Sequence, residues 1–112
     1  MLYYVTMNTI QPTMFAALAD PTRMSIIAML AKFGELSASD ISIRFDTTAS
    51  AISQHLKVLR EAGLVIVQKR AQKRIYQLDT AAMSGLEEWI NIRTKEWNNR
   101  LDTFDNYAQQ IK

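Results

Sequence analysis

The segment at residues 47–64, TTASAISQHLKVLREAGL, constrains the fold of this chain more than any other. Ile52, Leu56 and Leu59 recur at helical spacing and form one apolar stripe, whereas the opposite side of the same helix is polar. Gly63 stands where a glycine commonly ends a helix, and the strand-forming run LVIV at residues 64–67 starts directly after it. The segment therefore predicts an amphipathic helix that leads at once into a β-strand.

A second, shorter helix is predicted just upstream. Ser37 and Asp40 fit the capping-box pattern at its start, and Ile41 and Phe45 supply its apolar face. Residues 46–48, DTT, break this helix and cap the next one. Two short helices joined by a tight polar turn predict a helix-turn-helix, whose second helix enters the major groove of DNA. The side chains predicted to reach the groove are Ser50, Ser53, Gln54 and Lys57, and Gln54 has the geometry to pair with adenine through two hydrogen bonds.

The residues that follow predict a basic β-hairpin beside that helix. Strands are expected at residues 64–70 and 74–78, but the connection at 71–73, AQK, contains no Gly, Asn or Asp, which leaves the turn type and the register open. Residues 53–78 hold six of the 13 bases and only one of the 11 acids, although the net charge of the chain is only +2. This concentration favours phosphate binding, and a solvated basic hairpin is the alternative interpretation. The residues assigned to phosphates or the minor groove are Thr48, Lys69, Arg70, Lys73 and Arg74.

The first third of the chain is predicted to form the structural scaffold of the domain. A short helix is expected at residues 13–19, and a second helix starts at Asp20 and Pro21, which are typical of the N-cap and first helical positions. Gly34 ends this second helix. The side chains expected to turn toward the core are Met24, Ile27, Ala28, Leu30 and Ala31.

The last third predicts one long helix. Residues 80–111 contain no proline and only one glycine, and their apolar positions recur in steps of three and four with Arg93 as an interruption. Such a helix is about 45 Å long, more than the rest of a small domain can cover, so its apolar stripe is expected to pair with a second copy of the chain. A helix broken near Gly85 or residues 98–99 that folds back on its own domain is the alternative. The predicted dimer interface comprises Met14, Leu86, Ile90, Trp97, Leu101, Phe104 and Ala108.

These patterns together predict a mostly α fold with a small β-hairpin (α+β), namely a winged helix-turn-helix with a long C-terminal dimerisation helix. At 112 residues the chain is expected to form a single domain, with a winged-helix core at 13–79 and the dimerisation helix at 80–112.

Four segments resemble, in the same order, the ArsR-type winged helix-turn-helix repressors. They are ADPTR at 19–23, ELSASDI at 35–41, SQHLKVLREAGLV at 53–65 and RIYQL at 74–78. The resemblance covers about residues 13 to 80. It implies a homodimeric, DNA-binding transcriptional regulator, usually a repressor, in which the first and last helices build the dimer interface. Promoter occlusion is the expected mode of repression.

The chain departs from the metal-sensing members of that family. Those proteins often carry a Glu-Leu-Cys-x-Cys-Asp-Leu motif, whereas Ser37 and Ser39 occupy the two cysteine positions here and the chain contains no cysteine. Soft metals need thiolate ligands, which serine hydroxyls do not replace. A second family site uses acidic and histidine residues on the last helix, which here has acids but no histidine. The only histidine is His55, beside the buried stripe, where a packing or hydrogen-bonding role is expected. We therefore expect a metal-independent branch of the family, with no metal site and no cofactor.

The remaining features limit the other classes of function. No nucleophile–base–acid set and no phosphate-cradling glycine loop occurs, so an enzyme is not expected. No run of eighteen apolar residues and no signal-peptide pattern occurs, and the absence of cysteine fits a reducing cytoplasm. The expected partners are a double-stranded DNA operator and a second copy of the chain, with an inducer or anti-repressor as a further, unidentified class. The rival interpretation is a winged-helix module whose basic face docks an acidic protein.

Overall fold

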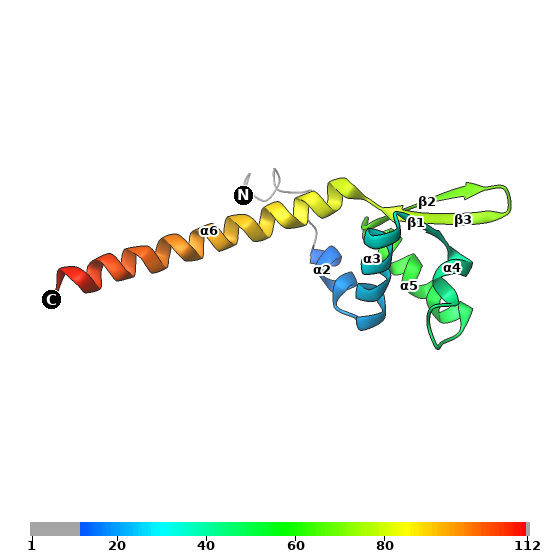
Figure 1. Cartoon of the computed structure of the whole chain (residues 1–112), viewed down its shortest axis with the longest axis horizontal. Coiled ribbons are helices and arrows are strands. Elements are labelled where there is room, and N and C mark those ends of the chain that lie inside the picture. The colour runs from blue at the N-terminus through cyan, green and yellow to red at the C-terminus, as the bar shows by residue number, and fades with distance from the viewer. Residues whose placement is uncertain (1–11, 112) are drawn as a thin grey trace.

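The computed structural model describes residues 12–111. Figure 1 shows a body of helices and a small sheet, a hairpin that projects from one side and one long helix that leaves on the other. This arrangement is a winged helix-turn-helix with a long C-terminal helix, as the sequence predicted. The elements in chain order are α2 (Pro12–Leu18), α3 (Pro21–Phe33), β1 (Glu35–Ser37), α4 (Ala38–Ser42), α5 (Ala49–Glu61), β2 (Val65–Arg70), β3 (Lys73–Leu78) and α6 (Thr80–Gln110).

The helix boundaries follow from local chemistry. The Asp20 carboxylate accepts a hydrogen bond from the backbone N–H of Arg23 at 2.9 Å and caps α3. At the other end of α3, Gly34 has a φ of 86°, a left-handed conformation that suits glycine. The predicted capping box of α4 is present, because Ser37 Oγ accepts from the Asp40 N–H at 3.0 Å and Asp40 Oδ2 accepts from the Ser37 N–H at 3.2 Å.

The sheet has one strand more than the predicted hairpin. Its order is β1-β3-β2, and both pairings are antiparallel. The short strand β1 lies against β3, with Leu36 opposite Tyr76, and it ties the start of α4 to the wing formed by β2 and β3. The wing turn consists of Ala71 and Gln72, because Lys73 already pairs with Arg70. Ala71 has a φ of 54°, so an alanine occupies a conformation that usually calls for glycine.

The core lies between α3, α4, α5 and the inner face of the sheet. It contains the predicted stripe of α5 (Ile52, Leu56 and Leu59) together with Ile41 and Leu64. The face predicted for α3 is wrong in part: Met24 is 58% exposed and Ala28 and Ala31 are exposed, whereas Ile26 is fully buried beside Leu30. The sequence SIIAMLA is apolar on most of the helix surface, so periodicity alone does not select the side that packs. The residues at the α3 contact are Ile26 and Leu30, with Ile27 and Met29 partly buried at its edge.

Helix α6 is continuous from Thr80 to Gln110, so the broken helix considered above is wrong. Ala82 and Leu86 are buried at its start, and the rings of Phe15 and Trp89 lie 5.3 Å apart, which joins α2 to α6. Figure 1 shows the rest of α6 extending away from the body. Within the described residues no single helix has the length and apolar composition needed to cross a membrane, although the bent pair of α2 and α3 meets that test by length and composition alone.

Candidate nucleic-acid interface

The polar side of α5 forms the centre of the candidate interface. Ser50, Ser53, Gln54 and Lys57 are all exposed. Ser50, Gln54 and Lys57 lie opposite the buried stripe of α5, and Ser53 lies at the edge of this polar side. Thr48 is the N-cap, and its Oγ1 accepts a hydrogen bond from the Ala51 N–H at 3.0 Å. Thr48 therefore fixes the start of α5, in addition to the phosphate contact predicted for it. The arrangement presents short polar groups and one base along a single exposed helix surface.

On the wing, Arg70 is engaged within the chain. Its guanidinium donates two hydrogen bonds to the Glu35 carboxylate, at 2.7 and 3.0 Å, and a third to Gln68 Oε1 at 3.2 Å. The hydrogen bonds from Arg70 lower the pKa of Glu35, although desolvation of the carboxylate acts in the opposite direction. The same hydrogen bonds raise the pKa of Arg70. Sequence reasoning missed this contact because β1, which places Glu35 beside the wing, spans only three residues and has no periodicity to detect.

The other wing bases are differently placed. Lys69 and Arg74 lie opposite each other in the β2–β3 ladder. In the part of the chain that the structure describes, no carboxylate oxygen lies within 4.0 Å of the side-chain nitrogens of Lys69, Lys73 or Arg74. The charge of Lys73 helps to lower the pKa of Asp40, after the larger effect of the hydrogen bonds to Ser37. The wing thus presents three exposed cations that are able to bind phosphates.

One further base near this face was not predicted. Arg44 lies in the turn between α4 and α5, and its guanidinium stacks on the Phe33 ring at 4.9 Å. Because Phe33 and Arg44 are eleven positions apart and lie in different segments, no local sequence pattern predicts their contact. Arg44 therefore adds a positive charge in the turn of the helix-turn-helix.

A polar cluster holds α5 against the start of α3. Arg23 Nε donates to the Ala17 carbonyl at 2.6 Å, and Arg23 Nη1 lies 3.2 Å from His55 Nδ1. Since arginine only donates, His55 Nδ1 accepts in this pair. The Asp20 carboxylate lies 3.8 Å from the same nitrogen, and its pKa is lowered chiefly by the backbone hydrogen bond from Arg23. His55 therefore has a hydrogen-bonding partner, and its ring helps to orient the helix that carries Gln54.

From residue 12 to residue 111, no group of three or more His, Cys, Asp or Glu side chains is placed to hold a metal ion. Ser37 is buried with its hydroxyl committed to the capping box, whereas Ser39 is exposed.

The predicted dimer residues fall into two groups. Met14 and Leu86 are each only 7% exposed, so both belong to the core of the single chain and present little surface to a partner. Ala108 is half-buried. The remaining predicted dimer residues expose a large part of their apolar side chains along α6. Tyr107 and Ile111 extend the same exposed surface. The exposed members of the predicted set are Ile90, Trp97, Leu101 and Phe104.

Comparison with known proteins agrees with this geometry. The model of the bacterial regulatory protein, arsR family, matches residues 20–67, which span α3 to the first half of β2. The HTH-type transcriptional regulator Rv2034 of Mycobacterium tuberculosis is 40% identical over 95 residues, covering 85% of this chain and 82% of that protein. The chain belongs to the ArsR family.

Two further similarities extend over most of this ArsR-family chain. The transcriptional repressor SdpR of Bacillus subtilis is 33% identical over 76 residues, covering 68% of this chain and 83% of SdpR. The solved structure of an ArsR-like transcriptional regulator from Rhodococcus sp. RHA1 aligns with a TM-score of 0.75 at 28% identity, covering 96% of this chain and 97% of that one. The family consists of DNA-binding transcriptional regulators and not of enzymes, which confirms the resemblance and the regulatory class predicted from sequence.

Proposed function

We propose that this ArsR-family protein is a homodimer that binds a specific duplex operator and represses transcription by occluding the promoter. The main observation in support is that the exposed polar side of α5 lies beside a wing that carries three cations. None of these three cations is paired with a carboxylate of the described residues. Phosphates bound by the wing and by Arg44 would position the protein, and α5 would read base edges. Ser50, Ser53, Gln54 and Lys57 are the proposed groove residues, with Thr48, Lys69, Lys73 and Arg74 at the backbone.

Dimerisation through α6 supports this proposal on geometric grounds. The exposed side chains of Trp97, Leu101 and Phe104 follow one another along a helix that extends beyond its own domain. Two such helices, paired about a two-fold axis, would bury these surfaces and set two recognition helices on successive turns of one duplex, about 34 Å apart. We assign residues 13–79 to DNA binding and 80–112 to dimerisation, and we place the protein in the cytoplasm, where promoter DNA is reached.

We also propose that repression does not respond to metals. The support is chemical, because both cysteine positions of the family's thiolate motif are serine and the Ser37 hydroxyl already caps α4. Titrating zinc, cadmium or arsenite into the protein–operator complex is expected to leave DNA affinity unchanged. Release of the operator at micromolar metal, reversed by a chelator, would contradict this part of the proposal.

Selection of bound sequences from a pool of random duplexes tests the function directly. The full-length protein is expected to enrich one sequence with two-fold symmetry, and its affinity for that sequence is expected to fall steeply as salt concentration rises. Failure to enrich any sequence would contradict operator binding. Tight binding to an acidic protein, together with indifference to duplex DNA, would instead support the docking module.

A further inference from the structure

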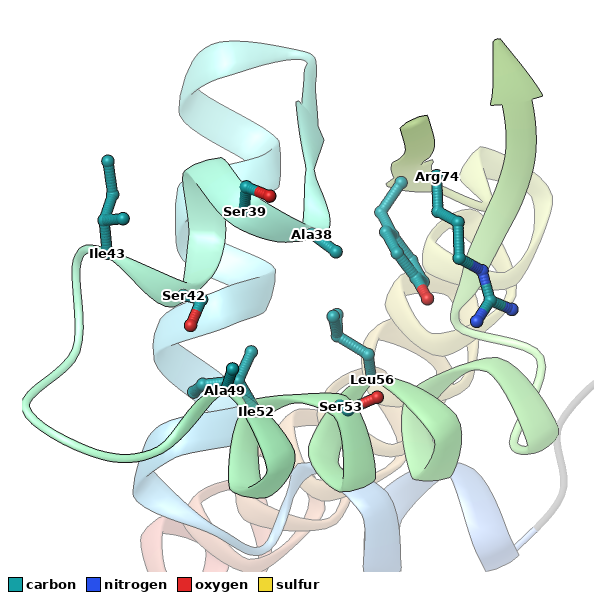
Figure 2. Close-up of a pocket in the computed structure, with 10 residues that line it drawn as sticks. Ala38, Ser39, Ser42, Ile43, Ala49, Ile52, Ser53, Leu56 and Arg74 are labelled. Atoms are coloured by element: carbon teal, nitrogen blue, oxygen red, sulfur yellow. The ribbon is translucent and has the colours of Figure 1, made fainter. Parts of the chain in front are cut away.

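A cavity of about 370 Å³ lies between α4, α5 and strand β3. This volume falls within the range of roughly 300–1,000 Å³ that is typical of small-molecule sites. Figure 2 shows α4 above the cavity, α5 below it and the strand that carries Arg74 at its side. The cavity therefore lies between the two helices of the helix-turn-helix and the wing, beside the proposed DNA contacts.

The lining of the cavity is mostly apolar. Ala38 and Ala49 supply small apolar walls that are at least partly exposed, and the buried side chains of Ile52 and Leu56, each 1% exposed, lie directly behind them. In Figure 2, Leu56 points up from α5 toward the space below Ala38. A DNA phosphate is fully polar and stays at the protein surface, so it does not match a mostly apolar lining. An occupant with an apolar body matches it better.

The rim carries polar groups suited to an anion. Ser39 and Ser42 line the cavity from α4, Ser53 lines it from α5, and Arg74 contributes a guanidinium from β3. Arg74 has no carboxylate within 4.0 Å among the described residues. A guanidinium offers paired N–H groups that fit the two oxygens of a carboxylate, and the hydroxyls supply further donors.

We propose that this cavity is an effector site for a small carboxylate with an aromatic or aliphatic body, and that the bound carboxylate displaces DNA. The apolar body would lie between Ala38 and Ala49, in front of Ile52 and Leu56, while Arg74 binds the carboxylate group. Ser53 and Arg74 are also proposed DNA contacts, so ligand and operator compete for the same side chains. The competition rests on the proposed function, whereas binding of the carboxylate to the cavity does not.

Nuclear magnetic resonance titration of the full-length protein without DNA tests the site itself. The probe is phenylacetate, and phenylacetamide is the neutral control of nearly the same shape. Phenylacetate is expected to shift the backbone amide signals of residues that line the cavity, and to bind at least about tenfold more tightly than phenylacetamide. Equal affinity for the two probes, no binding, or shifts confined to the exposed face of α6 would each overturn the proposal.

Variants then locate the anion contact. Arg74→Gln is expected to remove the preference for phenylacetate over phenylacetamide, whereas Lys69→Gln, directly opposite on β2 and outside the cavity lining, should retain it. Ser42→Leu, which fills the cavity with an apolar side chain at a position outside the proposed DNA interface, should abolish binding of both probes. Loss of the preference in Lys69→Gln, or its retention in Arg74→Gln, would overturn the assignment of Arg74.

Competition is measured last, with the selected operator. Phenylacetate is expected to release the operator from the parent protein but not from Ser42→Leu, which keeps the DNA-contacting residues. Equal release from both proteins, or no release from the parent at saturating phenylacetate, would overturn the effector role. Failure to bind any operator would contradict the proposed function alone, since the DNA-free titration stands independently of it.

Discussion

Arg70 on the wing and Glu35 on β1 form a two-point ion pair that joins both edges of the three-stranded sheet. The guanidinium donates to the two carboxylate oxygens at 2.7 and 3.0 Å, with both side chains about half exposed. A pair so accessible to water contributes little to stability, so its main effect is on the charge that the wing presents. Arg70, which the sequence predicts to bind phosphate, is therefore paired with an acid of the same chain.

The first prediction concerns this pair. Glu35→Gln should raise the affinity for non-specific duplex DNA several-fold and increase the salt slope by about one phosphate contact, because Arg70 is released and a negative charge is removed. Filter binding or fluorescence anisotropy across a salt series measures both quantities. Glu96→Gln is the matched control, since it removes a carboxylate from the Arg93 pair on α6. A salt slope that is identical in the parent and Glu35→Gln would contradict the prediction.

A second prediction concerns groove readout. Gln54→Ala and Lys57→Ala should each weaken specific binding without unfolding the protein, because both side chains are exposed on the polar side of α5. Loss of a good base contact is expected to cost about 1–3 kcal/mol and to relax selectivity at one base pair. Binding to the operator and to a scrambled duplex gives both values, with Lys95→Ala on α6 as the control. Unchanged operator affinity in both variants would remove these residues from the readout.

The third prediction concerns the dimer. Leu101→Glu or Phe104→Glu should give a folded monomer, because each side chain is exposed on the single chain but is proposed to be buried against its copy. An unpaired charge in that interface costs on the order of 3–5 kcal/mol. The monomer should lose most of its specific affinity and keep weak, salt-sensitive DNA binding.

Analytical ultracentrifugation followed by operator binding tests this prediction. Asn99→Glu introduces the same charge on the opposite side of α6 and should remain dimeric. A parent protein that sediments as a monomer and still binds its operator tightly would exclude the dimer.

The fourth prediction is that the stability of the protein in acid depends on Asp20. Its pKa is lowered below the ordinary 3.8 by the backbone hydrogen bond from Arg23, so the folded state favours the charged carboxylate. The stabilising contribution is therefore complete above the unfolded-state pKa and is lost as the pH falls through the lower, folded-state pKa. Asp20→Asn keeps an N-cap acceptor but does not titrate, so its free energy of unfolding should fall less between neutral and acidic pH. Urea unfolding at several pH values measures this difference.

The wing turn gives a fifth prediction. Ala71 has a φ of 54°, where an alanine side chain is strained, so Ala71→Gly should stabilise the protein by about 0.5–1 kcal/mol after the entropic cost of glycine. Gln72→Gly is the control, because among the described non-glycine residues only Ala71 has a positive φ and Gln72 gains no such relief. Chemical denaturation of the three proteins decides the matter. A lower midpoint for Ala71→Gly than for the parent would show that the turn tolerates alanine without strain.

Local chemistry determined most of the elements. Helix starts are predicted by local capping residues, namely Asp20 with Pro21 and Ser37 with Asp40. Helix ends are predicted by Gly34 and Gly63, which both adopt a positive φ. The stripe Ile52, Leu56 and Leu59 gave the buried side of α5, and therefore the exposed positions of Gln54 and Lys57, because the remaining residues of that helix are mostly polar.

Only the tertiary structure decided which side of α3 is buried, because its sequence is apolar nearly all round and the choice of Ile26 over Met24 depends on what packs against it. It also decided that Met14 and Leu86 lie in the core and that Glu35 holds Arg70. The short strand β1 pairs with residues about forty positions away, and such a contact leaves no trace in local periodicity. The cavity beside Arg74 arises in the same way, since its walls come from three elements whose spacing is set by the packing of the whole domain.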